Sequence, residues 1–306
     1  MAGLTGWFGG KNSMSEWIYS SIPKNIKTYV EPFSGSFPIF FNEDFSHVEK
    51  IVYNDANKLQ VNFMKCAKDY NNFLEYLDKS FEVGGFLYTD KTDITDVKKH
   101  YRDLYTRTKD GKVCDFYDNL DFDFPDFDRA VIYAFMITSA FNACHARGAG
   151  FSGFNSGKNP KLKIQTLLNK LRNEHYRYKL DNLTHILNDD FEKCINEFDS
   201  EETFIYLDPP YKHTNHTKGT HNTDYGSHDT FGDGHERLAS ILKNTKSRWS
   251  LSYYFFPELE EWFPKDKYHW MEKEFFRSSA SFSDNKDTMG RELLILNYDP
   301  ETGIKF

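Results

Sequence analysis

Cysteines are few in this sequence, and none of them lie close together. Cys66, Cys114, Cys144 and Cys194 are the four cysteines of the 306-residue chain, and no two of them form a C-x-x-C pair. Paired spacings of that kind are typical of zinc and redox sites, and a disulfide framework is typical of small secreted domains. We therefore expect free thiols and no metal.

Long apolar runs are also missing. No stretch approaches the roughly 18 to 20 apolar residues that a membrane-spanning helix needs. Near the start, Trp7-Phe8-Gly9-Gly10-Lys11 interrupts any segment that would resemble a signal peptide. The chain is long enough to bury a full core, as one large domain or two smaller ones. We expect a cytoplasmic protein without membrane contact.

The chain also lacks an excess of positive charge. The formal net charge is −8, which argues against a general binder of polyanions, because phosphate contacts depend on Lys and Arg. The charge is unevenly distributed. Residues 115–128 carry six aspartates and no Lys or Arg, whereas residues 158–179 carry seven Lys or Arg and one acid, Glu174. Each run fits a solvated surface, and the basic run also fits a surface that contacts phosphates.

Short apolar runs alternate with helical patterns over much of the chain. This alternation favours an α/β sheet with helices on both faces. The last two runs, separated by a polar loop, predict an antiparallel hairpin added at one edge of the sheet. The predicted strands are residues 26–30, 50–53, 203–207, 249–253, 268–276 and 292–298, and the predicted helices are residues 38–42, 128–146, 235–243 and 257–263.

The middle of the chain follows another pattern. Between residues 61 and 174 there is no alternation of strands and helices, only helix-like and polar-aromatic segments. We therefore predict an inserted, mostly helical domain over residues 61–174. The surrounding core would consist of residues 1–60 and 175–306.

A turn after the first predicted strand is the first candidate for ligand binding. The sequence V-E-P-F-S-G-S contains Glu31, Phe33 and Gly35, and a glycine turn between a strand and a helix lets the backbone approach a ligand. Twenty residues after Gly35, Asp55 ends the second strand, where an acid can accept hydrogen bonds from a ribose diol. A single glycine also fits a plain structural turn. Together the two features predict an adenosine-containing cofactor, and at this point both a nicotinamide cofactor and S-adenosylmethionine remain open.

The stretch D-P-P-Y distinguishes between these cofactors. It follows the predicted strand 203–207, so Asp208 and the carbonyl of Pro209 lie at the carboxyl end of a strand as two fixed acceptors. Two adjacent acceptors match the two hydrogens of an exocyclic amino group. Tyr211 offers a face on which a base can stack, an interaction worth about 1 to 3 kcal/mol. The stretch therefore predicts a methyltransferase acting on an amino group of a base.

Five motifs in order resemble those of the Dam-like family of DNA adenine methyltransferases. They are W-F-G-G-K at residues 7–11, V-E-P-F-S-G-S at 30–36, Y-N-D at 53–55, N-D-D-F at 188–191 and D-P-P-Y at 208–211. The resemblance implies a Rossmann-like sheet that binds S-adenosylmethionine, with an inserted helical domain for target recognition. It also implies that Asp208, Pro209 and Tyr211 hold a flipped adenine. Residues matching cofactor contacts in the family are Trp7, Lys11, Asp55, Asp190, Phe191 and Asp208.

The resemblance further implies double-stranded DNA as the partner. The inserted domain and the R-S-S-A-S loop at residues 277–281 match regions that touch DNA in the family. The basic run at residues 158–179 fits a phosphate contact because it follows the F-N-x-G element. The candidate DNA-binding residues are Arg147, Asn155, Lys158, Lys161, Lys163, Arg277, Ser278 and Ser279.

Two departures from the family pattern qualify these expectations. Phe37 stands where the family has a further glycine, so we expect its ring to disturb the approach of the cofactor. Residues 148–157 keep the F-N and G of the family, including Asn155, but lack the Arg and Asn through which well-studied members read their site, so GATC is not the expected target.

Other functions remain open from the sequence. D-P-P-Y also fits a methyltransferase acting on RNA or on the amino group of cytosine, and Phe37 motivates a DNA-binding relative without catalytic activity. The histidines His213, His216, His221, His228 and His235 favour a gating or DNA-contacting loop over a metal site, because their neighbours are Thr, Asn and Gly.

Overall fold

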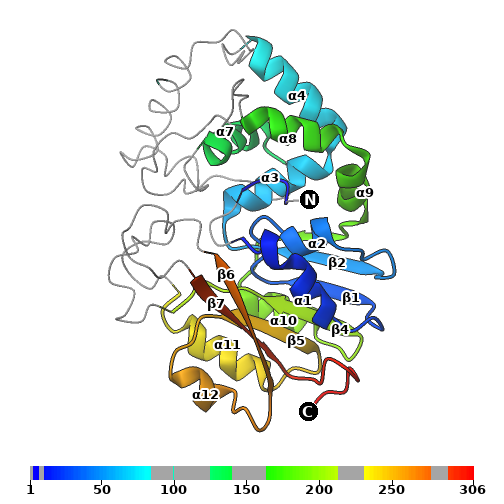
Figure 1. The fold of residues 1–306 in the computed structure, drawn as a ribbon. Helices are drawn as coiled ribbons and strands as arrows, with labels where there is room; N and C mark the ends of the chain where they lie inside the picture. The colour runs from blue at the N-terminus through cyan, green and yellow to red at the C-terminus, as the bar shows by residue number, and fades with distance from the viewer. Residues whose placement is uncertain are drawn as a thin grey trace.

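The computed structural model describes residues 3–6, 10–83, 99, 125–139, 163–212, 231–276 and 289–306. A seven-stranded sheet in the order β3-β2-β1-β4-β5-β7-β6 forms the lower half of the molecule (Figure 1). The predicted Rossmann-like α/β sheet is confirmed. The strands are β1 (Thr28–Glu31), β2 (Lys50–Asn54), β3 (His185–Leu187), β4 (Thr203–Leu207), β5 (Arg248–Tyr253), β6 (His269–Phe276) and β7 (Met289–Leu296).

The central strands form because short apolar runs can be buried on both faces of a parallel sheet. Every residue of β1, β4 and β5 is buried, as expected where helices cover both faces. Parallel pairing sets Val30 opposite Val52 on one side and opposite Ile205 on the other. The carboxyl ends of these strands therefore lie at a common edge of the sheet.

The predicted edge hairpin is also confirmed. β7 pairs antiparallel with both β5 and β6, with Leu293 opposite Tyr253 and opposite Glu272. Because β7 runs against the parallel strands, its first residues lie beside the carboxyl end of β5. This reversal brings residues from the end of the sequence to the edge where β1 and β4 end.

Alternate side chains of each strand enter two separate cores. On one face, Tyr29 and Phe204 pack with α1 (Ser15–Ser21) and α2 (Pro38–Asn42). On the other face, Val30 and Ile205 pack with the helices α10 (Phe191–Phe198), α11 (Gly234–Leu242) and α12 (Glu258–Trp262). Cys66 and Cys194 are free and buried, as predicted.

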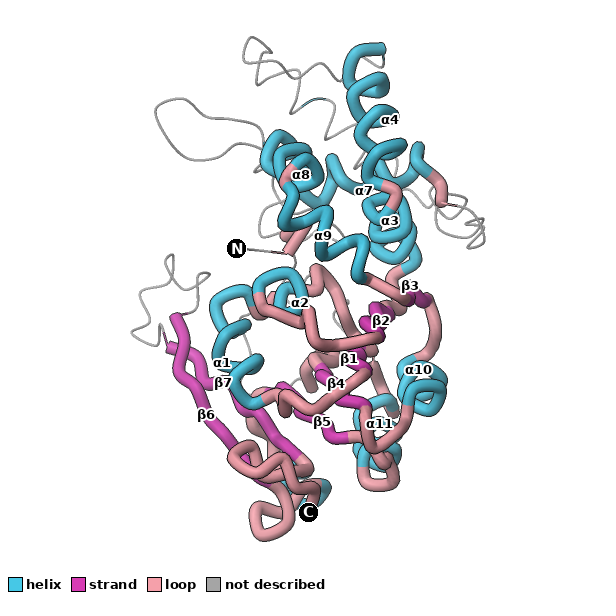
Figure 2. Tube along the Cα trace, turned by 90° about the vertical axis from the view of Figure 1, so that its right-hand side faces the viewer, coloured by secondary structure: helices cyan, strands magenta, loops and turns pink. Residues whose placement is uncertain are grey.

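A group of helices lies beyond the sheet, at the top of Figure 1, and the view in Figure 2 agrees. Its helices are α3 (Lys58–Lys68), α4 (Tyr70–Val83), α7 (Phe127–Ser139), α8 (Lys163–Arg172) and α9 (Glu174–Asn182). Asn57 caps α3 by accepting hydrogen bonds from the backbone N–H groups of Leu59 and Gln60. Apolar side chains of α3, α7, α8 and α9 join the core that contains α1 and α2.

Both predicted domain boundaries fall in helices of this group. The boundary at residues 60/61 falls inside α3, and the boundary at 174/175 falls at the start of α9. The division into a core and an inserted recognition domain stays a prediction. The predicted helix 128–146 corresponds to α7 as far as Ser139, and its remainder lies outside the described residues. A membrane-spanning helix would need more length and more apolar residues than any helix in the described ranges has.

Candidate active site

The candidate residues lie where the direction of strand connections reverses. From β1 the chain proceeds to β2 and β3 on one side, and it later occupies β4 and β5 on the other side. In open α/β sheets, ligands bind outside the carboxyl ends of the strands at such a point. Glu31 is the last residue of β1, and Asp208 directly follows β4.

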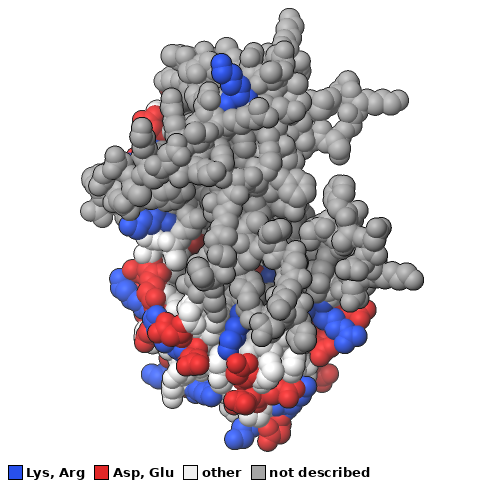
Figure 3. Space-filling view, turned by 90° about the vertical axis from the view of Figure 1, so that its left-hand side faces the viewer, with Lys and Arg blue, Asp and Glu red and all other residues white. Residues whose placement is uncertain are grey.

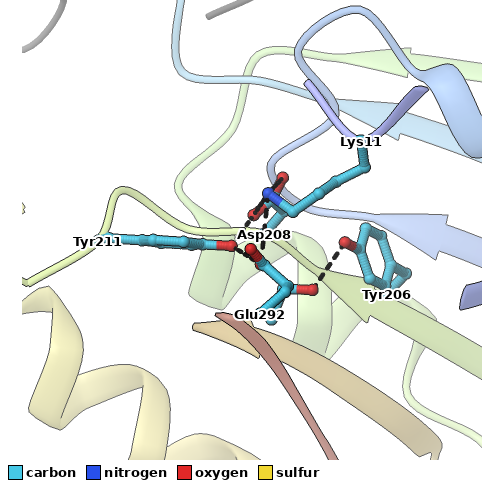
Figure 4. Close-up of polar contacts among 6 residues, drawn as sticks. Lys11, Tyr206, Asp208, Tyr211 and Glu292 are labelled. Carbon is cyan, nitrogen blue, oxygen red and sulfur yellow. Dashed lines mark hydrogen bonds and ion pairs between the residues drawn. The ribbon is translucent and has the colours of Figure 1, made fainter. Parts of the chain in front are cut away.

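Asp208 is held by an ion pair with Lys11. The Nζ atom of Lys11 donates to both carboxylate oxygens, at 2.8 Å from Oδ1 and 2.9 Å from Oδ2 (Figure 4). The side chain of Lys11 is 7% exposed, whereas that of Asp208 is 21% exposed. Pro209 and Pro210 fix the chain that follows. The carboxylate is therefore immobilised from the protein side and remains partly accessible.

Tyr211 is tethered at both its hydroxyl and its ring. Its hydroxyl donates to Oδ1 of Asp208 at 3.0 Å and also contacts Oε1 of Glu292. The ring centroid lies 5.4 Å from that of Tyr253 and 4.6 Å from that of Tyr254. Burial, followed by the nearby carboxylates, raises the pKa of Tyr211 well above its usual value, so the hydroxyl stays protonated and acts as a donor.

Glu292, near the start of β7, completes this cluster. It is 1% exposed, and its Oε1 atom lies 3.5 Å from Nζ of Lys11. Burial raises the pKa of Glu292 to about 7, against the opposing effect of Lys11. Burial lowers the pKa of Lys11, but the charges of Asp208 and Glu292 together raise it by more than burial lowers it. The pKa of Lys11 is therefore above its usual value, and Lys11 remains charged. We did not predict Glu292 as a site residue. The sequence feature that could have identified it is an acidic residue at the start of the apolar run E-L-L-I-L.

The turn after β1 is built around Gly35, which has a φ of +49°. Its carbonyl accepts hydrogen bonds from the Tyr53 hydroxyl at 2.8 Å and from Nε2 of Gln60 at 2.7 Å. Gln60 in turn accepts from the Tyr133 hydroxyl of α7 at 2.7 Å. Because all of these groups are buried, the turn is fixed from β2 and from the helical group.

Asp55 lies against the same turn, and its predicted contact with a ribose stays a prediction. Its Oδ2 accepts from the N–H of Gly35 at 2.8 Å, and its Oδ1 accepts from the N–H of Asn57 at 2.8 Å. Each carboxylate oxygen can accept two hydrogen bonds, so each retains one acceptor position. Burial raises the pKa of Asp55 to about 6, although the two N–H donors oppose the shift.

Glu31 is buried beneath the turn. It is 2% exposed and its Oε1 accepts from the Tyr29 hydroxyl at 2.5 Å. Burial raises the pKa of Glu31 well above its usual value. Its assignment to the cofactor stays a prediction.

Phe37 adopts the left-handed conformation, with a φ of 54°. Its ring is fully buried and packs against Tyr29, Phe40 and Tyr53. The backbone strain of about 1 to 2 kcal/mol is offset by burial of the ring, worth about 1.5 to 3 kcal/mol. The ring packs into the core, and its effect on the approach of the cofactor stays a prediction.

Phe33 and Phe191 come together beside the turn. Their ring centroids lie 5.4 Å apart, and Phe231 packs against both. Asp190 caps α10 by accepting from the N–H of Glu192, and its carboxylate pairs with Arg237 at 2.9 Å. These contacts give Asp190 a structural role, and its predicted cofactor contact remains untested.

Several predicted site residues lie outside the described residues. They are Trp7, Arg147, Asn155, Lys158, Lys161, Arg277, Ser278 and Ser279. Lys163 begins α8, but its side chain is likewise outside the description.

The histidine-rich stretch is mostly outside the description too. His235 is described: it is buried in α11, with Nδ1 2.7 Å from the Tyr253 hydroxyl. Within the described ranges, no group of three or more His, Cys, Asp or Glu side chains is arranged to hold a metal ion.

This chain is similar in sequence to known proteins over most of its length. The family model of D12 class N6 adenine-specific DNA methyltransferases matches residues 7–279. The chain is 26% identical over 304 residues to Type II methyltransferase M1.LlaDCHI of Lactococcus lactis subsp. cremoris, and the match spans 96% of this chain and 95% of that protein.

Two further relatives match about four fifths of the chain. Type II methyltransferase M.MjaIII of Methanocaldococcus jannaschii is 27% identical over 251 residues, covering 79% of each protein. Type II methyltransferase M.CviBI of Paramecium bursaria Chlorella virus NC1A is 24% identical over 251 residues, covering 81% of each. The resemblance seen in the five motifs is confirmed. The chain belongs to the D12 class N6 adenine-specific DNA methyltransferase family and is an adenine-specific DNA methyltransferase.

Proposed function

We propose that this enzyme transfers the methyl group of S-adenosylmethionine to the 6-amino group of an adenine that has left the DNA duplex, and that Asp208 and Pro209 hold that amino group. The observation that carries the proposal is the carboxylate of Asp208, fixed by Lys11 and Tyr211 but still 21% exposed. A carboxylate in this position can accept a hydrogen bond from an amine without moving.

The residues at the turn after β1 fit the cofactor. Asp55 retains one acceptor position on each oxygen, which matches the two hydroxyl donors of a ribose. Phe33 and Phe191 provide apolar surface next to these acceptors. Bound S-adenosylmethionine would supply a reactive methyl group on a positively charged sulfur.

The chain itself contributes positioning. Extrusion of the base costs a few kcal/mol, and stacking on the Tyr211 ring would offset part of that cost. Asp208 and the carbonyl of Pro209 would accept the two amino hydrogens and turn the nitrogen lone pair toward the methyl group. Most of the rate enhancement would come from this orientation. The mechanism requires no metal ion and no covalent enzyme intermediate.

DNA contacts would come mainly from residues outside the description. On the face shown in Figure 3, acidic and basic side chains intermingle over the described part of the sheet layer. The described residues on this face form no broad basic surface, and the proposed phosphate contacts are local ones made by the predicted basic residues. A cytoplasmic location stays a prediction.

Nucleoside analysis tests the proposal. The protein is incubated with methyl-labelled S-adenosylmethionine and, separately, with duplex DNA and RNA, and the products are digested to nucleosides. We expect label in N6-methyladenine from DNA. Label in N4-methylcytosine or only in RNA would favour the alternative substrates.

Calorimetry addresses the alternative of a catalytically silent DNA-binding relative. Absence of S-adenosylmethionine binding would support that alternative. Burial of the Phe37 ring in the core speaks against this alternative.

A further inference from the structure

Glu292 is a buried charged group for which the proposed transfer step has no role so far. It lies on β7, opposite Lys273 of β6, and β7 enters the site from the antiparallel direction. Figure 4 shows its carboxylate pointing at the Tyr211 hydroxyl and the Lys11 amine. A carboxylate buried to 1% exposure is costly unless it is paired.

The carboxylate of Asp208 has few hydrogen-bond acceptor positions left for a substrate. A carboxylate offers about four acceptor positions. Lys11 donates to both oxygens, and Tyr211 donates to Oδ1 as well, so three of these about four positions are taken. The remaining position is on Oδ2, and an amino group that approaches Oδ1 competes there with the Tyr211 hydroxyl.

The Tyr211 hydroxyl has one proton and two carboxylates within reach. A phenol donates a single hydrogen bond, yet this oxygen contacts both Asp208 Oδ1 and Glu292 Oε1. If the proton points to Glu292, Oδ1 of Asp208 becomes available. If it points to Asp208, the position that the substrate needs is occupied.

We propose that Glu292 is a positioning residue for methyl transfer, which accepts the hydrogen bond of the Tyr211 hydroxyl and thereby frees Oδ1 of Asp208 for the amino group of the target base. This rests on the proposed role of Asp208. The tyrosine keeps its proton, and no covalent bond is made to Glu292. The residue acts through Tyr211, and it also keeps the ring anchored at its hydroxyl end.

Two substitutions of Glu292 distinguish the loss of its hydrogen-bond acceptor from the loss of its negative charge. Glu292→Met keeps the length of the side chain and removes the acceptor, whereas Glu292→Gln keeps one acceptor oxygen. Loss of a hydrogen bond to a charged group is worth about 1.5 to 3 kcal/mol, so we expect Glu292→Met to lower kcat by at least about tenfold. Glu292→Gln should lie between this variant and the wild type. Affinities for DNA and S-adenosylmethionine should change by less than about threefold, because the loss acts at the transfer step.

The decisive comparison uses Tyr211→Phe as a second background. Without the hydroxyl, Asp208 Oδ1 is free whether or not Glu292 is present, so Glu292→Met should then cost less than about threefold. A kcat loss at least about fivefold larger in the wild-type background than in the Tyr211→Phe background supports the proposal. A smaller ratio overturns it. Glu274→Gln is the matched control, since it removes an exposed carboxylate from the same hairpin.

A spectroscopic measurement is independent of methyl transfer. In protein labelled with ¹³C at the tyrosine Cζ, the Tyr211 resonance can be assigned by its loss in Tyr211→Phe. We expect it to titrate near pH 7 as Glu292 ionises, and to lose that titration in Glu292→Gln. The other ionisable groups that interact with Glu292 are Lys11, Asp208 and Tyr206, Lys273 lies opposite it on β6, and all remain in the variant.

The two measurements distinguish the possible failures. If the wild-type protein methylates no adenine, the proposed function fails, and the Tyr211 titration still reports whether Glu292 takes the hydroxyl. If Glu292→Met does not fold, the same cycle with Glu292→Gln decides the matter. A Tyr211 resonance unaffected by Glu292→Gln would overturn the proposal.

Discussion

Replacing Asp55 with asparagine is expected to weaken S-adenosylmethionine binding, by an amount that depends on pH. The carboxylate would accept from the ribose hydroxyls while holding the N–H groups of Gly35 and Asn57. A hydrogen bond to a charged acceptor contributes about 2 kcal/mol, which corresponds to a roughly 30-fold increase in Kd. The turn should still fold in the Asp55→Asn variant, because the Gly35 carbonyl is also held by Tyr53 and Gln60.

The pH dependence follows from the raised pKa of Asp55, which is about 6. Above that pH the group is ionised and accepts well, whereas below it protonation removes an acceptor position. We therefore expect the wild-type Kd to be flat from pH 7 to 8 and to rise as the pH falls below 6. At pH 5 the wild type should have lost about tenfold in affinity, so the ratio of variant to wild-type Kd should shrink to about threefold.

Calorimetric titration between pH 5 and 8 measures both quantities. Taking the ratio of the two proteins cancels contributions from Glu292 and from the cofactor, which are common to both. Asp69→Asn, a substitution on the surface at the far end of α3, is the matched control. Equal affinities of Asp55→Asn and wild type at pH 7.5, or a ratio independent of pH, would refute the assignment of Asp55.

Two further predictions concern stability. Lys11→Met leaves the carboxylates of Asp208 and Glu292 without their common cation, so urea unfolding at pH 8 should show a loss of about 3 to 5 kcal/mol. That loss should shrink as the pH falls through 7, where Glu292 takes up a proton, and a loss independent of pH would count against the cluster. Phe37→Gly should lower the free energy of unfolding by about 2 to 3 kcal/mol, because truncating a buried Phe costs about 3 to 5 kcal/mol and the relieved left-handed strain returns about 1 to 2 kcal/mol. It should change the Kd for S-adenosylmethionine by less than about threefold, and an improvement above about tenfold would show that the ring does obstruct the turn.

The strands that were predicted from sequence share one property. β1, β2, β4 and β5 are apolar runs ended by polar residues, and both their faces are buried, so periodicity and turn residues sufficed to find them within about two residues. β3 was missed because its three residues are only half-buried and contain a histidine. α10 was missed as a helix, although Asp190 at its start is a typical capping residue.

The site was predictable where its residues end neighbouring strands. Gly35 and Asp55 follow adjacent parallel strands, which is why both lie at the same edge of the sheet. Glu292 was not predictable in this way, because its partner Tyr211 lies 81 residues away in the chain and Lys11 lies near the opposite end. Only the antiparallel course of β7 brings it to the carboxyl edge of the sheet. The Phe37 departure was visible in the sequence, but the direction of its ring depended on a left-handed backbone that sequence patterns do not reveal.

The most direct test of the account is the amount of N6-methyladenine that Asp208→Ala produces in DNA. The variant keeps Glu292 as a partner for Lys11, so it is expected to fold and to bind duplex DNA within about threefold of the wild type. Its rate of methyl transfer, measured by mass spectrometry of digested DNA under single-turnover conditions, should fall by at least about 100-fold. A variant that methylates adenine at the wild-type rate would contradict the assignment of Asp208 as the group that holds the target amine.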